Sequence, residues 1–70
     1  MENVFKERLK ELRIENNLSQ EKLAKASGLT QPAITMWENG TRTPNMESII
    51  LLAKFFNVSS DYLLGIKDFY

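Results

Sequence analysis

The chain has 70 residues, of which 43% are hydrophobic, and this is enough for a single small domain over residues 1–70 and too little for two. It has neither cysteine nor histidine, which excludes disulfides, thiol or imidazole catalysis and the usual zinc ligands. Nine basic residues balance nine acidic ones, so the chain lacks the excess of positive charge that supports tight, indiscriminate binding to nucleic acid.

Three amphipathic helices are predicted in the first forty residues. Phe5, Leu9 and Leu12 recur at helical spacing over residues 5–16. Ser19 and Thr30 can each accept hydrogen bonds from the free amides of a helix's first turn, which predicts two more helix starts. Gly28 and Gly40 can take the left-handed conformation that ends these helices. The apolar residues predicted to face the core from these two helices are Leu23, Ala24, Ile34 and Trp37, with Ala26 as a further candidate.

Two further helices are predicted after Pro44, which disfavours a helix across that point. Asn45 can cap a fourth helix, and Asn57 ends it. Its predicted core residues are Met46, Ile49, Leu52, Ala53 and Phe56. Ser59 or Ser60 begins a short fifth helix, with Val58 filling the core before it and Gly65 ending it. The residues expected to pack from the fifth helix are Tyr62, Leu63 and Leu64. Strand-like alternation is absent from the sequence, so we expect an all-α, compact bundle of about five helices.

An ordered set of motifs spans residues 5–65 without a gap. The motifs are Leu12-Arg13, Leu18-Ser19-Gln20-Glu21-x-Leu23-Ala24, Gly28-Leu29-Thr30-Gln31, Ile34-x-x-Trp37-Glu38-Asn39-Gly40, Pro44 and Val58-Ser59-x-Asp61-x-Leu63-Leu64. Together they resemble the Cro/phage-repressor (Xre-like) helix-turn-helix family. The resemblance implies a lambda-repressor-like fold with the helix-turn-helix at the second and third helices. It also implies that the third helix lies in the major groove of double-stranded DNA, commonly as a homodimer on an inverted repeat.

The resemblance places the base-reading positions of this family on Gln31, Pro32, Thr35 and Met36. Gln31 can pair with N6 and N7 of adenine, and Thr35 can donate or accept a hydrogen bond. Pro32 and Met36 offer only apolar contact, for example to a thymine methyl, where the family more often has polar residues. We therefore expect A·T-weighted half-sites, with part of the specificity left to DNA shape. The alternative is that these four are ordinary exposed helix residues.

The resemblance also places four phosphate contacts beside this helix. Gln20 matches the family position at the start of the second helix, where an amide and the helix backbone hold a phosphate. Asn39, Thr41 and Arg42 match the loop after the third helix, and Arg42 is the one strong cation there. The alternatives are a surface glutamine near a cap and a plain turn. Because the net charge is zero, we expect useful affinity only from a dimer on a matching site.

Arg13 and Glu38 occupy positions that form a partly buried ion pair in the family, which would hold the third helix at a fixed angle. The alternative is two unrelated surface charges. Since desolvation offsets the attraction between buried charges, the intact pair is expected to add little net stability, whereas removing one partner is expected to destabilise the fold.

The chain has more large apolar residues than one small core needs. The candidates for a homodimer surface are Leu51, Phe55, Ile66, Phe69 and Tyr70, the last three in a short apolar tail over residues 65–70, and Ile14 and Ile50 add to the surplus. The alternative is that this tail folds back over its own chain.

The predicted function is sequence-specific DNA binding by a transcriptional regulator, most simply a repressor of an operator. Two alternatives share parts of this interpretation: an antitoxin that binds its own operator and presents the apolar surplus to a toxin partner, and a helical adaptor that binds only proteins. An adaptor would tolerate the loss of Gln20, Gln31 and Arg42.

Catalysis, metal binding and a bound cofactor are not expected. Glu7, Glu11 and Glu15 lie four residues apart, but basic neighbours make them a solvated helix face rather than an acid-base or metal site. The sequence has no apolar run of roughly 18 residues and no signal-peptide pattern at its start, so we expect a cytoplasmic protein without a membrane partner.

Overall fold

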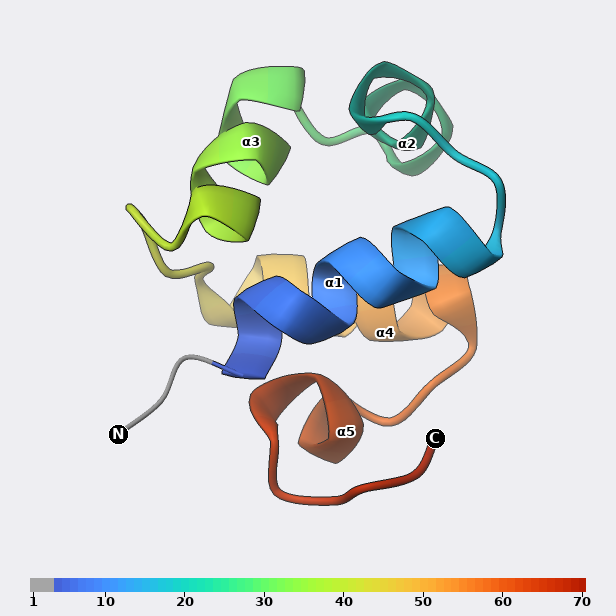
Figure 1. Cartoon of the computed structure of the whole chain (residues 1–70), viewed down its shortest axis with the longest axis vertical. Helices are drawn as coiled ribbons and strands as arrows, with labels where there is room; N and C mark the ends of the chain where they lie inside the picture. Colours follow the sequence, from blue (N-terminus) through green and yellow to red (C-terminus); the bar gives the residue numbers. More distant parts are fainter. Residues whose placement is uncertain (1–3) are drawn as a thin grey trace.

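The computed structural model describes residues 4–70, which form five helices (Figure 1). They are α1 (Val4–Glu15), α2 (Gln20–Ser27), α3 (Gln31–Asn39), α4 (Met46–Phe56) and α5 (Ser60–Leu64). No strand occurs in this range, so the predicted all-α class is confirmed. In the same range, no helix is both long and apolar enough to span a bilayer.

Short polar side chains begin four of these helices, and left-handed residues end them. In each case the cap side chain accepts a hydrogen bond from the backbone amide three residues later, which satisfies one of the free donors of the first turn. The caps are Ser19, Thr30, Asn45 and Ser59. The left-handed residues are Gly28, Gly40, Asn57 and Gly65. Of the two predicted starts for α5, the structure therefore selects Ser59.

The helices surround one core centred on α1. α1 packs against α3 and α5, α2 packs against α3 and α4, and α4 also packs against α5. In Figure 1, α2 and α3 lie above α1 and α5 lies below it. The fully buried side chains come from all five helices: Leu9, Leu12, Leu23, Ile34, Leu52 and Leu63. The rings of Phe5 and Trp37 meet edge to face, 6.2 Å apart, and join α3 to α1.

Three residues predicted to face the core are exposed. Ala26 is exposed because it lies about 110° around α2 from the middle of the buried face that Leu23 and Ala24 form. Met46, the first residue of α4, is 76% exposed, whereas the buried residues of this helix, Leu52 and Ala53, lie in its second half. Leu64, the last residue of α5, is 47% exposed because Leu63 takes the inward position.

Residues after α5 fold back over the chain. Arg8 of α1 donates hydrogen bonds to the carbonyl oxygens of Tyr62 (2.5 Å) and Lys67, and its guanidinium lies 4.2 Å from the centre of the Tyr62 ring. Tyr70 packs edge to face on Tyr62, with 4.8 Å between ring centres. The Tyr70 hydroxyl donates to a Glu15 carboxylate oxygen at 2.5 Å, and the Tyr70 carbonyl accepts from the amide of Ser59 at 3.1 Å. The tail is thus held against α1 and the start of α5.

Candidate nucleic-acid interface

α2 and α3 are joined by a turn of residues 28–30. Gly28 has a φ of +84°, a backbone conformation that costs glycine little and other residues more, and it turns the chain sharply away from α2. Thr30 then begins α3, where its hydroxyl accepts from the amide of Ala33 at 3.3 Å. The turn therefore sets the angle between two helices that also pack on each other.

α3 has a buried side and an outer side. Ile34 and Trp37 face the core and fix the rotation of the helix. Of the four predicted base-reading residues, Gln31 and Pro32 are exposed in the first turn, whereas Thr35 and Met36 are half-buried. Pro32 costs the helix little because the amides of the first turn have no partner inside the helix.

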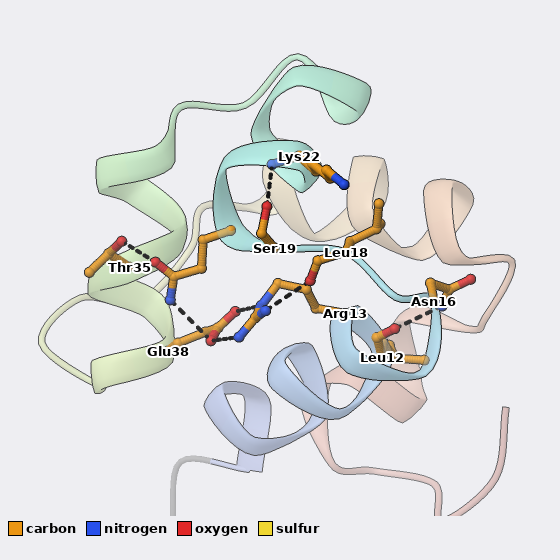
Figure 2. Close-up of polar contacts among 9 residues, drawn as sticks. Leu12, Arg13, Asn16, Leu18, Ser19, Lys22, Thr35 and Glu38 are labelled. Atoms are coloured by element: carbon orange, nitrogen blue, oxygen red, sulfur yellow. Dashed lines mark hydrogen bonds and ion pairs between the residues drawn. The ribbon is translucent and has the colours of Figure 1, made fainter.

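Arg13 and Glu38 form an ion pair between α1 and α3 (Figure 2). Arg13 Nε donates to Glu38 Oε2 at 2.7 Å and Nη2 donates to Oε1 at 3.0 Å, so the pair is bidentate. Arg13 Nη1 donates to the carbonyl of Leu18 at 2.9 Å. The side chains of Arg13 and Glu38 are only 13% and 4% exposed, and the hydrogen bond to Glu38 raises the pKa of Arg13. The end of α3 is therefore tied to the end of α1 by a nearly buried charge pair.

Gln20 extends this contact from Glu38 to the middle of α3. Gln20 Nε2 donates to Glu38 Oε1 at 3.2 Å, and Gln20 Oε1 accepts from the Thr35 hydroxyl at 2.6 Å (Figure 2). Gln20 was predicted as a phosphate contact, and its bridge between Glu38 and Thr35 was not predicted. The spacing of Thr35 and Glu38, three residues apart on one face of α3, was the available signal.

The phosphate contacts predicted in the loop after the third helix lie together at the carboxyl end of α3, where Asn39 is the last helical residue rather than a loop residue. Asn39, Thr41 and Arg42 are all exposed. The amide and the hydroxyl of Thr41 both donate to the carbonyl of Met36, at 3.0 Å and 3.1 Å. The Thr41 hydroxyl is therefore engaged in closing the helix, while Arg42 places an exposed cation beside it.

The predicted homodimer surface is divided in the structure. Leu51 is half-buried, and Phe55 is 37% exposed beside Phe56, with their rings edge to face. Tyr70 contacts its own chain through Glu15 and Tyr62, as the alternative of a folded-back tail predicts for that residue. Ile66 and Phe69, by contrast, are 71% and 70% exposed. Homodimerisation itself remains a prediction.

Residues 4–70 contain no group of three acidic side chains positioned to hold a metal ion. Glu7, Glu11 and Glu15 are exposed on α1, where the sequence placed a solvated face.

The sequence pattern of the helix-turn-helix family matches residues 9–63, which include α2, α3 and the turn between them. The chain belongs to this family. The resemblance drawn from the sequence motifs is therefore confirmed.

Similar proteins include several regulators. The chain is 47% identical to the HTH-type transcriptional activator BcrR of Enterococcus faecalis over 61 residues, which are 87% of this chain and 30% of BcrR. It is 38% identical to the control protein C.SmaI of Serratia marcescens over 71 residues, covering 97% of this chain and 84% of that protein. The chain spans 30% of BcrR and 53% of the Bacillus subtilis regulator YqaE, so it corresponds to only part of these relatives.

The same fold occurs in solved structures. The P22 c2 repressor in complex with a synthetic operator matches with a TM-score of 0.79 and 35% identity, over 86% of this chain and 91% of that one. The controller protein C.AhdI from Aeromonas hydrophila matches with a TM-score of 0.76 and 37% identity, over 84% and 89% of the two chains. These matches confirm the predicted repressor-like bundle.

Proposed function

We propose that this chain binds double-stranded DNA in a sequence-specific manner, as the DNA-reading part of a transcriptional regulator. The observation that carries the proposal is the placement of α3. Its inner side is fixed by Trp37 and by the Arg13–Glu38 pair, while Gln31 and Pro32 stand exposed at its amino end. A rigidly held helix with a free outer side is what insertion into a major groove requires. The likeness to the operator-bound P22 c2 repressor supports DNA binding by this fold.

Four residues of α3 are proposed to meet base edges: Gln31, Pro32, Thr35 and Met36. Gln31 lies where its amide can pair with adenine, and Pro32 can contact a thymine methyl. The half-buried Thr35 and Met36 lie one turn further along the helix. This arrangement supports an A·T-weighted half-site.

The proposed phosphate contacts flank α3 on both sides. At the start of α2, Gln20 uses one amide hydrogen on Glu38; its second amide hydrogen and the backbone amides of Gln20 and Glu21 are the proposed donors for a phosphate, since the Lys22 amide donates to Ser19. At the end of α3, Arg42 supplies charge and Asn39 and Thr41 supply short polar groups. Phosphate contacts of this kind set the register of the protein on the duplex.

We further propose that two copies act together on an inverted repeat as a repressor in the cytoplasm. The relatives include an activator and a repressor of transcription, since BcrR is named an activator and the Vibrio cholerae phage protein RstR a repressor. A chain with zero net charge gains little DNA affinity from phosphate contacts alone. Because two copies double the number of base contacts, pairing is the simplest route to useful affinity. The exposed Ile66 and Phe69, together with Phe55, are the proposed contact between copies. The α3 helices of the two copies would then lie about 34 Å apart, which is one turn of duplex DNA.

The test is selection of binding sites from random DNA at two salt concentrations. We expect an inverted repeat to be enriched. Arg42→Ala should weaken binding to all sequences alike and reduce the salt slope by about one, whereas Gln31→Ala should change the preferred sequence. Lys54→Ala, at an exposed residue of α4, is the matched control for loss of a positive charge. Feeble binding to all sequences, with no motif, would contradict the proposal.

A further inference from the structure

The hydrogen bonds from Arg13 through Glu38 and Gln20 to Thr35 have a fixed direction. The Glu38 carboxylate is paired with Arg13 and, when ionised, can only accept hydrogen bonds. Gln20 must therefore turn its amino group toward Glu38, and the observed distance of 3.2 Å joins these two groups. This assignment follows from the chemistry of Glu38, because the opposite orientation of the Gln20 amide would place two acceptors against each other.

The direction of the Gln20 amide decides the role of Thr35. With its amino group on Glu38, Gln20 presents its carbonyl oxygen to the Thr35 hydroxyl, 2.6 Å away. A carbonyl has no hydrogen to give, so Thr35 must donate. A hydroxyl has only one hydrogen, and after this bond it keeps only lone pairs for other partners. A threonine that can ordinarily donate or accept thus becomes an acceptor.

We propose that Thr35 reads DNA only as an acceptor and recognises an exocyclic amino group, N6 of adenine or N4 of cytosine. It would not donate to N7 or O6 of guanine or to O4 of thymine. Donating to any of these would require breaking the bond to Gln20 and leaving a half-buried carbonyl without its partner. The inference rests on the proposed function, since it specifies what one residue of the DNA-reading helix requires.

The position of Thr35 on α3 indicates which base is involved. Thr35 follows Gln31 by four residues, so the two side chains lie on the same face of the helix, about one turn apart. Gln31 is exposed at the amino end, and Thr35 lies deeper along the helix. The amino group read by Thr35 therefore belongs to a base near the one contacted by Gln31 and is a separate specificity position.

The experiment uses the enriched duplex with single atoms removed from its bases. Purine in place of adenine removes the N6 amino group, 7-deazaadenine removes N7 and keeps the amino group, and 2-pyrimidinone in place of cytosine removes N4. At one position per half-site, we expect loss of the amino group to weaken wild-type binding by about tenfold and 7-deaza substitution to have little effect. Thr35→Val should abolish the amino-group dependence at that position alone, and Thr35→Ser should retain it.

Gln20→Leu tests the direction of the chain, because it frees the Thr35 hydroxyl to donate. We expect this variant to tolerate guanine or thymine where the wild type requires the amino group. Circular dichroism checks that each variant is folded. Independently of DNA, the Thr35 hydroxyl proton should be visible by NMR as slowly exchanging and close to the Gln20 side chain, and a rapidly exchanging hydroxyl would overturn the inference.

Two further outcomes separate failure of this inference from failure of the proposed function. If the wild type selects a motif but Thr35→Val changes no position, or changes dependence on N7, O6 or O4 instead, the acceptor role is wrong and DNA reading stands. If the wild type selects no motif, the proposed function fails and this inference fails with it.

Discussion

Replacing Arg13 with methionine tests whether the ion pair holds α3 in place. Arg13 donates two hydrogen bonds to Glu38 and one to the Leu18 carbonyl. Without Arg13, the Glu38 carboxylate, whose side chain is 4% exposed, would keep, among the contacts of residues 4–70, only the hydrogen bond from Gln20. Removing one partner of a buried pair costs about 3–5 kcal/mol, and Arg13 is partly reached by water, so we expect about 3 kcal/mol.

Urea unfolding followed by circular dichroism measures this loss. Thermal unfolding gives a second measure. For a chain of this size, each kcal/mol of lost stability lowers the midpoint of thermal unfolding by about 4–8 °C, so Arg13→Met should lower that midpoint by about 12–24 °C. Adding Glu38→Gln should restore about 1 kcal/mol or more, because a neutral amide is cheaper to bury than an unpaired carboxylate. Lys25→Met is the control, since it breaks an exposed pair with Glu21 at 3.5 Å and should cost less than about 0.5 kcal/mol.

Two results would refute this reasoning. One is a loss for Arg13→Met no larger than that for Lys25→Met. The other is a double variant as unstable as Arg13→Met alone, which would show that the unpaired charge of Glu38 is not the source of the loss.

Three further predictions concern the tail, the turn and the core. The hydrogen bond to Glu15 raises the pKa of Tyr70 to about 12, so the tail contact should persist above pH 10 and be lost as the pH rises through about 12. The difference between the absorbance titrations of wild type and Tyr70→Phe measures the pKa of Tyr70, and ionisation near pH 10 would contradict the prediction. Gly28→Ala should destabilise the fold by about 1–2 kcal/mol in urea because its φ is +84°, and Gly28→Asn by less, so equal losses would exclude backbone strain as the cause. Leu52→Ala should cost about 3 kcal/mol because the side chain is fully buried. Without DNA and at a protein concentration that keeps the chain monomeric, Ile66→Ala should cost less than about 0.5 kcal/mol in the same assay; similar values would mean that the monomer covers its own tail.

Helix starts were predictable because capping is a local interaction. Ser19, Thr30 and Asn45 each bond to an amide three residues away, so no knowledge of the remaining fold is needed. Periodicity was less reliable at helix ends. It gives the face on which a residue lies, but whether another helix reaches that residue depends on tertiary packing, and this is why Met46 and Leu64 were predicted wrongly.

The site was predictable to different degrees for a similar reason. The exposure of Pro32 follows from helical spacing, because it lies two residues from the buried Ile34 and so on the other side of α3. Gln31 lies three residues from Ile34, so its exposure depends on what packs beside the start of the helix. Arg13 and Glu38 are 25 residues apart, so only the family resemblance could pair them. The bridge from Gln20 to Thr35 depends on the distance between two packed helices; the spacing of Thr35 and Glu38 puts both on one face of α3, but it does not say which residue of α2 reaches them.

The hydrogen bond between the Tyr70 carbonyl and the Ser59 amide has a practical consequence for measuring DNA binding. Its backbone carbonyl, bonded to Ser59, would still be present if a fluorophore or affinity handle were attached beyond it. In Figure 1 the carboxyl terminus lies at the lower right and α3 at the upper left. A dye coupled there would leave the proposed groove-facing side open but would adjoin Phe69 of the proposed contact between copies, so comparing labelled with unlabelled protein in DNA titrations would show whether that contact contributes to affinity.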